Sequence, residues 1–357
     1  MTCRIDRFLY QKEKSFWTKT LLLPLYLFSL PYGGAVRARS LFYSFRLLKT
    51  ETLPCPVISM GNITAGGTGK TPHVMALAKG LMQRGISVAI LSRGYKARRS
   101  SGSLVSDGHT LLLSPDEAGD EPFLMAQSLM GIPVLIGKDR FANGKIALQR
   151  FNIQGLLLDD GYQHLQLHRD LNILLIDSQT GFGDPHLLPR GILREPLSHL
   201  SRADLFLLTK VKHPEACQPL ETSLHLAYPS VQIFHSHYEP LGLIGPKGER
   251  EEIQSLKGKK VIALSGIADP TSFSSLLRTC GMEVVEEVIH PDHYHYRSID
   301  LTNLRKKMNQ VDWVVTTEKD MVKLKVFNMD PFPLRALRIG VKLWEEDVFF
   351  NRVMELF

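Results

Sequence analysis

The sequence predicts an α/β fold in which a parallel sheet is covered by helices on both faces. Three observations lead to this prediction. Continuous apolar runs, which are typical of strands buried on both faces, recur along the chain and alternate with helical stretches. A glycine-rich loop joins the first of these strands to a helix. The composition, with 44% hydrophobic and 22% charged residues in a chain of 357, is that of an ordinary globular protein, and it excludes wholesale disorder, a collagen-like repeat and a polytopic membrane protein.

The first fifty residues account for the net positive charge of the whole chain. Nine Lys and Arg against two Asp and Glu in residues 1–50 account for the formal net charge of +7, so the rest of the chain is balanced. An apolar run over 21–30 is followed by a stretch, 36–49, with four apolar side chains on one helical face: Leu41, Phe42, Phe45 and Leu48. Two short apolar helices flanked by cations are typical of a membrane surface. We therefore expect an N-terminal membrane-surface helical segment.

Alternatives to this expectation are a helix pair packed on the protein, a spanning helix and a cleavable signal peptide. The run over 21–30 is short for a span, which needs about 20 apolar residues, and no clear cleavage site follows it. Basic residues confined to one terminus do not form the basic face of a nucleic-acid binder, so we expect no nucleic-acid partner. The four cysteines form no CxxC pair or disulfide framework, which indicates a reducing compartment.

A phosphate-binding loop follows the first predicted strand, 56–60. It reads Gly61-Asn-Ile-Thr-Ala-Gly-Gly-Thr-Gly-Lys-Thr71 and leads into a predicted helix over 72–79. This order is that of a Walker A motif, although Thr64 stands where the motif has its first glycine. In such a loop backbone N–H groups surround phosphate oxygens, the lysine reaches the β- and γ-phosphates and the hydroxyl binds Mg²⁺. The expected nucleotide-binding residues are Gly66, Gly67, Thr68, Gly69, Lys70 and Thr71.

Two later strands end in aspartate, as a Walker B strand should. We favour 155–160 over 172–177, because the adjacent carboxylates of Asp159 and Asp160 need a cation to offset their repulsion, and Mg²⁺ is the natural cation beside nucleotide phosphates. Further strands, some joined by helices such as 138–150, are expected near 88–92, 133–136, 204–209 and 231–234. Ligands of such sheets bind at the carboxyl ends of the strands, where the turns over 92–95 and 159–164 fall.

A second, smaller α/β domain is expected toward the C-terminus. A strand over 260–266, a helix near 270–280 and strands near 282–286 and 312–317 predict it. The resulting division gives an N-terminal segment, a P-loop core, a linker and the smaller domain, with the boundaries 1–50, 51–230, 231–257 and 258–357. A cleft between two such domains can close phosphate transfer off from water.

Two polar clusters accompany this cleft. The histidines of 290–295 allow three interpretations: a zinc site, solvated loop side chains, or a histidine that works beside a carboxylate at the cleft. The carboxylates of 115–122 open a predicted helix, and capping explains Asp116 and Glu117 better than it explains Asp120 and Glu121.

Seven motifs occur in an order that identifies a family. They are GNITAGGTGKTP at 61–72, SRGY at 92–95, GDEP at 119–122, LLDDGYQH at 157–164, LLPRGILREP at 187–196, PDHYHY at 291–296 and TTEKD at 316–320. With them the chain closely resembles the tetraacyldisaccharide 4′-kinases, the lipid A 4′-kinases of Gram-negative bacteria, as far as about residue 325. Tyr162 departs from the family pattern, in which phenylalanine is common at this place.

The resemblance implies a P-loop core and a smaller α/β domain joined by a two-stranded linker. It implies transfer of the γ-phosphate of ATP, with Mg²⁺, to the 4′-hydroxyl of a membrane-bound tetraacyldisaccharide 1-phosphate, which gives lipid IVA. The expected partners are this anionic glycolipid and the cytoplasmic face of the bacterial inner membrane, with no obligate protein partner inferred.

The resemblance also implies roles for individual residues. Asp120 acts with His293 as the base, and Lys70 and Asp160 are further catalytic residues. Thr71, Glu121 and Asp159 are expected to bind the metal. The residues expected to line the substrate site are Tyr95, Gln163, His164, Arg194 and Glu195.

The main alternative is a membrane-associated P-loop NTPase that couples hydrolysis to conformational work. Its sharper form is a GTPase, because TTEKD is weakly similar to a guanine-reading T/N-K-x-D motif. Neither Asp159 nor Asp160 begins the D-x-x-G switch that a GTPase needs. A non-catalytic lipid-binding module is a second alternative, but it would leave the phosphate loop without a use.

Overall fold

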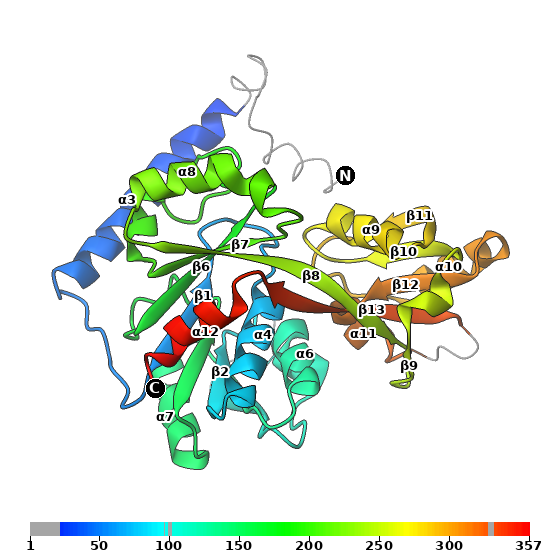
Figure 1. Cartoon of the computed structure of the whole chain (residues 1–357), viewed down its shortest axis with the longest axis horizontal. Helices are drawn as coiled ribbons and strands as arrows, with labels where there is room; N and C mark the ends of the chain where they lie inside the picture. Colours follow the sequence, from blue (N-terminus) through cyan, green and yellow to red (C-terminus); the bar gives the residue numbers. More distant parts are fainter. Residues whose placement is uncertain (1–21, 96, 99–101, 328–331) are drawn as a thin grey trace.

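The computed structural model describes residues 22–95, 97–98, 102–327 and 332–357. In these residues one hydrogen-bonded sheet of 13 strands passes through two cores that lie side by side (Figure 1). The strands of the first core are β1 (Val57–Gly61), β2 (Val88–Ser92), β3 (Ser103–Ser106), β4 (Val134–Ile136), β5 (Gly155–Asp159), β6 (Leu171–Asp177) and β7 (Leu205–Thr209). Their order is β7-β6-β1-β5-β2-β4-β3, and all of these pairs are parallel except β3 with β4.

Helices cover both faces of this first sheet. On one face lie α4 (Lys70–Gln83), α5 (Pro115–Ala118) and α6 (Asp120–Ser128), whose apolar side chains share a core with Ile58 and Ile90. On the other face lie α7 (Arg140–Arg150) and α8 (Gln218–Ala227). They pack against strand side chains that point to this second face, such as Val57 and Phe206. The predicted fold class, a parallel sheet covered on both faces, is therefore confirmed.

The second core is smaller and also has two covered faces. Its parallel strands are β10 (Lys260–Ser265), β11 (Glu283–Ile289) and β12 (Trp313–Thr317). One face packs against α9 (Pro270–Thr279), and the other packs against α10 (Ser298–Lys307) and α11 (Glu318–Leu324). Short 3-10 turns lie at Leu197–Arg202, Pro214–Cys217, Ile253–Leu256 and Met308–Gln310.

Two long antiparallel strands join the cores. β8 (Gln232–Ile244) pairs in parallel with β7 as far as His235, and from Ser236 onward it pairs with β13 (Leu334–Leu343), while the short β9 (Arg250–Glu251) adds to its far end. β13 in turn continues the second sheet through β12. The two strands thus bridge the cores, as Figure 1 shows in green and red.

After β13 the chain returns to the first core. The last helix, α12 (Glu346–Met354), buries Phe349, Phe350 and Val353 in the same apolar cluster as α4. Phe350 lies so close to Gly80 of α4 that a Cβ at this glycine would overlap its ring. The last helix of the expected domain 258–357 thus buries its apolar side chains against the first core.

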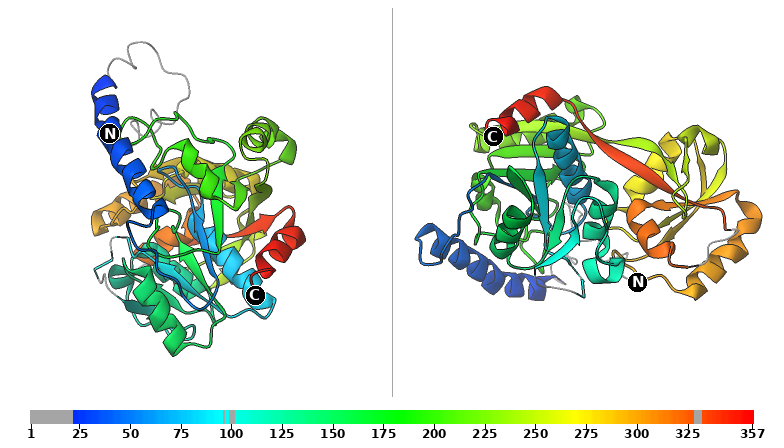
Figure 2. Two further views of the ribbon diagram at one scale, coloured as in Figure 1. Left: turned by 90° about the vertical axis from the view of Figure 1, so that its left-hand side faces the viewer. Right: turned by 90° about the horizontal axis from the view of Figure 1, so that it is seen from below.

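In its described residues, 22–50, the N-terminal segment forms one helix where the sequence predicts two short helices. α3 (Leu23–Ser44) runs through Pro31 and along the outside of the first core (Figure 2). Gly33 is buried at its contact with Leu187, and the Tyr32 hydroxyl donates a hydrogen bond to the Arg194 carbonyl at 2.8 Å. These contacts hold the middle of α3 against the first core. They explain why the helix continues through Pro31 and Gly33, residue types that usually interrupt helices.

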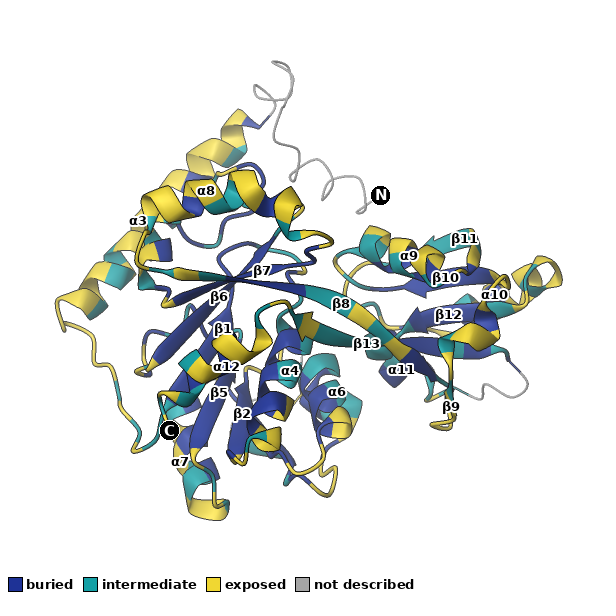
Figure 3. Ribbon diagram, in the orientation of Figure 1, coloured by how far each residue is buried: buried dark blue, intermediate teal, exposed yellow. Residues whose placement is uncertain are grey.

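Much of the remaining length of α3 is exposed (Figure 3), and several of its exposed side chains are apolar. Leu27 is 59% exposed and Phe28 is 67% exposed, and Phe45, just beyond the helix end, is 72% exposed. Among the described residues no helix combines the length and the apolar character needed to cross a bilayer. Residues 1–21, with five of the basic side chains discussed above, lie outside the described part of the chain.

Candidate active site

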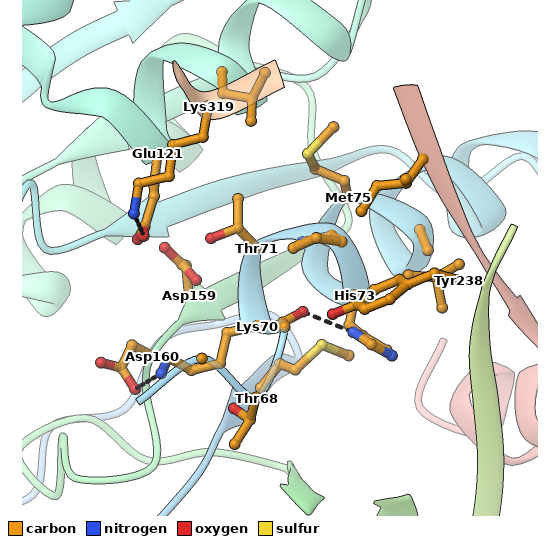
Figure 4. A pocket seen from close by; sticks show the side chains of 18 of the residues that line it. Thr68, Lys70, Thr71, His73, Met75, Glu121, Asp159, Asp160, Tyr238 and Lys319 are labelled. Atoms are coloured by element: carbon orange, nitrogen blue, oxygen red, sulfur yellow. Dashed lines mark hydrogen bonds and ion pairs between the residues drawn. The ribbon is translucent and has the colours of Figure 1, made fainter. Parts of the chain in front are cut away.

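The phosphate loop lies between β1 and the start of α4, as predicted. Gly66 has a φ of +108° and Gly69 a φ of +81°, which is backbone that glycine adopts without strain. The Asn62 side chain holds the loop through two hydrogen bonds. Its Nδ2 donates to Thr68 Oγ1 at 2.9 Å, and its Oδ1 accepts from Lys70 Nζ at 3.2 Å. The loop therefore presents Lys70 and the N-terminus of α4 toward the site (Figure 4).

Asp159 and Asp160 follow β5 beside this loop. Asp160 pairs with Lys70, whose Nζ is 3.6 Å away, and accepts hydrogen bonds from Arg194 Nη1 at 2.9 and 3.2 Å. Burial would raise the pKa of Asp160, but the cations of Lys70 and Arg194 hold it below its usual value. Asp160 also has a φ of +51°, a strained conformation that is often kept at functional sites.

Asp159 is in the opposite electrostatic situation. It is 4% exposed and accepts a hydrogen bond from Ser92 Oγ at 2.9 Å. Burial, with the nearby charges of Glu121 and Asp160, raises the pKa of Asp159 to about 7. Crowded carboxylates with a raised pKa are a favourable setting for a cation. The competing Walker B candidate, Asp177, is instead paired with Lys210 at 2.6 Å.

The two cores meet where α6 faces the loop before α10. His293 Nδ1 lies 3.3 Å from Asp120 Oδ2, and its ring centroid is 5.1 Å from that of Tyr95. Burial would raise the pKa of Asp120, but His293 and the ammonium groups of Lys323 and Lys319 hold it below its usual value. Of the three interpretations of the histidine cluster, the structure favours a histidine beside a carboxylate.

Lys319 also lies where the two cores meet, and no sequence pattern predicted its role. Its Nζ donates to Glu121 Oε1 at 2.8 Å, to Asp292 Oδ1 at 3.0 Å and to His293 Nε2 at 3.3 Å. Burial opposes its charge, but Glu121 and Asp292 raise the pKa of Lys319 above its usual value, so it stays protonated. Because Lys319 donates to Nε2, the His293 proton sits on Nδ1 and points at Asp120. The TTEKD motif contained this residue, but nothing in the motif indicated its partner on α6.

A cavity of about 1180 Å³ joins these groups. Its lining includes the following expected residues: Gly66, Gly67, Thr68, Gly69, Lys70, Thr71, Tyr95, Glu121, Asp159, Asp160, Gln163, Arg194, Glu195 and His293. Tyr32 and Arg39 of α3 also line it, so the N-terminal helix forms part of the cavity wall.

Two expected residues do not line the cavity. Asp120 lies behind His293, and His164 has a buried Nε2 with no partner among the described residues. Burial lowers the pKa of His164 to about 4, with help from the nearby charges of Arg140 and Arg169. Glu195, although it lines the cavity, is bound by Arg202 and by His199 Nδ1 at 3.1 Å, which gives it a bracing role in this structure.

Asp320 of the motif that suggested a GTPase is fully buried. Its Oδ2 accepts hydrogen bonds from the Gly266 amide at 2.8 Å and from Thr317 Oγ1 at 2.9 Å. The Thr317 hydroxyl also accepts from the Asp320 amide and so caps α11, while the Gly266 bond joins α11 to the end of β10. The carboxylate is thus used inside the second core. The zinc interpretation of the histidines of 290–295 finds no support in the part of the chain that the structure describes. No group of three or more His, Cys, Asp or Glu side chains suited to a metal occurs there.

Comparisons with known proteins show the family of this chain. The model of the family described as Tetraacyldisaccharide-1-P 4'-kinase matches residues 20–357. The chain belongs to this family. Among curated members, it is 41% identical to the Tetraacyldisaccharide 4'-kinase of Syntrophus aciditrophicus over 94% of this chain and 92% of the relative. It is 42% identical to that of Pelobacter propionicus over 87% of this chain and 86% of the relative.

A solved structure extends the likeness to three dimensions. LpxK from Aquifex aeolicus, in complex with ATP, is 35% identical and superposes with a TM-score of 0.75 over 95% of this chain and 99% of that chain. The match covers nearly the whole chain, so the likeness extends to the fold of both cores.

Proposed function

We propose that this protein transfers the γ-phosphate of ATP to the 4′-hydroxyl of a tetraacyldisaccharide 1-phosphate, a step of lipid A synthesis that yields lipid IVA. The observation that carries the proposal is the meeting of two groups across one cavity: a phosphate loop with Lys70 on one side, and the Asp120–His293 pair on the other. Membership of the family supports the activity, and the structural relative with bound ATP supports the nucleotide.

In the proposed reaction the sugar hydroxyl oxygen forms the new bond to the γ-phosphorus, and the bond from this phosphorus to the β,γ-bridging oxygen breaks, so ADP leaves. The hydroxyl proton goes to the Asp120–His293 pair. His293 Nε2, to which Lys319 donates at 3.3 Å in this structure, can accept it when the substrate hydroxyl takes the place of this ammonium group. Asp120 holds Nδ1–H and stabilises the charge that develops on the ring. Lys70 and Arg194 stabilise the negative charge of the transferring phosphate.

The residues present fit Mg²⁺. Mg²⁺ is usually held by one or two carboxylates together with substrate phosphates, and Asp159 is a buried carboxylate whose pKa is raised by burial and by the charges of Glu121 and Asp160. Thr71 and Asp159 would hold the ion, with Glu121 beside them. When bound, Mg²⁺ would draw charge from the phosphate oxygens.

A labelled-phosphate assay tests the proposed reaction against the alternative of an NTPase. Purified protein would be incubated with γ-labelled ATP and tetraacyldisaccharide 1-phosphate in detergent micelles. We expect label in the lipid, because the base lies across the cavity from the phosphate loop. Label found only in inorganic phosphate, with the lipid present, would support hydrolysis and contradict the kinase proposal.

We further propose that α3 places this cavity at the cytoplasmic face of the inner membrane. Support comes from the exposed apolar side chains of α3 and from Tyr32 and Arg39, which lie on the same helix and line the cavity. A membrane-anchored substrate can then enter the site without leaving the bilayer surface. Basic side chains in the first fifty residues would add attraction to anionic lipids.

Replacing Leu27 and Phe28 with glutamate tests the attachment. Burial of each side chain in lipid contributes about 2 kcal/mol, so we expect the pair of substitutions to weaken binding to anionic phospholipid vesicles at least tenfold, about 1.4 kcal/mol. Sedimentation with vesicles measures the bound fraction. The control is Val348→Glu on α12, where a side chain of 57% exposure is replaced in the same way on another helix. Equal losses in the two variants would refute a specific role of α3.

A further inference from the structure

A buried histidine on α4 has no part in the mechanism above. His73 is 2% exposed and follows the phosphate loop by two residues. Its Nδ1 lies 2.7 Å from the Gly69 carbonyl oxygen, and its Nε2 lies 2.8 Å from Ser236 Oγ on β8. One side chain therefore touches both the last glycine of the loop and the strand that leads to the second core.

The partners of His73 define its protonation. A carbonyl oxygen only accepts, so the proton sits on Nδ1 and is donated to Gly69. In the neutral ring with this tautomer, Nε2 accepts a hydrogen bond from the Ser236 hydroxyl at 2.8 Å. The same hydroxyl lies 3.2 Å from the Leu208 carbonyl oxygen at the end of β7, a longer contact.

Ser236 occupies a particular point of the topology. β8 pairs with β7 through His235, and Ser236 is the first residue that pairs with β13, opposite Leu343. Its carbonyl accepts a hydrogen bond from the Val211 amide at 2.8 Å, just after β7. The His73 contact is thus made where the first core ends and the bridging strands begin.

A second side chain of β8, that of Tyr238, lies against Gly69. Tyr238 lies two residues after Ser236 and so on the same face of the strand. A Cβ at Gly69 would overlap Tyr238 Oη, and the Tyr238 ring centroid is 6.0 Å from that of His73 (Figure 4). Gly69 is therefore enclosed by His73 on its own helix and by Tyr238 from the bridging strand.

We propose that His73 is a positioning residue that couples the phosphate loop to the bridging strand β8 through Ser236. The coupling keeps the nucleotide-binding loop in a fixed position relative to the second core, which carries His293. Only the kinetic part of this proposal rests on the proposed kinase reaction. The hydrogen bonds that carry it lie outside the contacts assigned above to substrate or metal.

Kinetics of His73→Asn and Ser236→Ala test the coupling. Asn retains a donor near Gly69 but cannot reach Ser236, and Ala removes only the hydroxyl. Since the loop itself binds the phosphates while the cores align the reacting groups, we expect kcat to fall about tenfold and KM for ATP to change less than about threefold. The double variant should be no slower than the slower single variant, because both remove one shared contact.

Ser274→Ala is the matched control. Ser274 is a buried serine on α9, and its hydroxyl donates to the Pro270 carbonyl at 3.2 Å, away from the loop. We expect its kcat to stay within about twofold of wild type. A fall in Ser274→Ala equal to that in Ser236→Ala, or an unchanged kcat in Ser236→Ala, would overturn the proposal.

Hydrogen–deuterium exchange supplies a readout that loss of packing alone would not change. In the wild type, a non-hydrolysable ATP analogue with Mg²⁺ should slow exchange both in the loop and in β8 over 236–243. In Ser236→Ala and His73→Asn the loop should stay protected while β8 loses its nucleotide-dependent protection. Retained protection of β8 in both variants would overturn the coupling.

The exchange experiment also separates this proposal from the proposed function, because it needs no lipid. A protein that fails to label the lipid, yet shows nucleotide-dependent protection of β8 that Ser236→Ala removes, would refute the kinase reaction and support the coupling.

Discussion

Lys70→Ala is expected to lower phosphate transfer by about 10³-fold, the scale found when one preorganised donor to a developing charge is removed. Lys70 begins α4, its side chain is largely enclosed, and its Nζ is held by Asn62 at 3.2 Å and by Asp160 at 3.6 Å. These partners aim the ammonium group into the cavity before the nucleotide binds. Alanine would remove this charge from the position where the transferring phosphate needs it. Transfer of label from ATP to the lipid by the purified variant measures the loss.

Lys145→Ala on α7 is the control for this substitution, since Lys145 is exposed and does not line the cavity. It should transfer phosphate like the wild type. Thermal unfolding should show that both variants are folded. If Lys70→Ala transferred phosphate at near wild-type rates, the loop would not be the phosphate site, and the assignment of Thr71 and Asp160 would fall with it.

The parallel sheet and the loop were predictable because both depend on local sequence. Strands buried on two faces require continuous apolar runs, and Leu156–Leu158 of β5 or Leu205–Leu208 of β7 are fully or almost fully buried. The turn of the loop likewise needs glycine at Gly66 and Gly69, where φ is positive. In these segments the pattern of residue types and the structure have the same physical cause.

The course of the termini could not be predicted in this way. The apolar runs over 21–30 and 36–49 predicted two short helices, but α3 continues through Pro31 because Gly33 fits against Leu187. The return of α12 to the first core depends on Phe350 lying over Gly80. Both are contacts between segments far apart in the chain, which no local pattern encodes.

For the site, motif positions identified the residue types, while their pairing came from the structure. The opposed environments of Asp159 and Asp160 illustrate this: the two carboxylates are adjacent, yet the pKa of Asp159 is raised to about 7 while that of Asp160 is lowered. The difference arises because Lys70 and Arg194 pair directly with Asp160. At Asp159, burial and the neighbouring carboxylates outweigh the smaller effect of Lys70. The bridge from Lys319 to Glu121 is a similar case, because it joins α11 to α6 across the cleft.

Asp120→Asn is expected to lower kcat by about 10² to 10⁴-fold, the range that general-base catalysis contributes. His293 donates its Nδ1–H to Asp120, and the carboxylate would stabilise the imidazolium that forms when Nε2 takes the hydroxyl proton. Asparagine keeps the size of the side chain but removes the charge. Because the pKa of Asp120 lies below its usual value, the wild-type carboxylate stays ionised as the pH falls through the neutral range. Single-turnover transfer at several pH values measures the loss, which should persist at neutral and higher pH.

Kinetics of single and double variants show whether Asp120 and His293 act together as one base or independently. If Asp120 and His293 act as one base, His293→Asn should be similarly slow, and the double variant should be no slower than the slower single variant. Asp116→Asn is the matched control, because Asp116 lies four residues earlier in the same acidic segment, is exposed and does not line the cavity. Losses that multiply in the double variant would mean that the residues act separately. An Asp120→Asn protein with more than a tenth of wild-type kcat would show that the proton leaves by another route, and Glu121, the next carboxylate on α6 and a cavity residue, would be the first to replace.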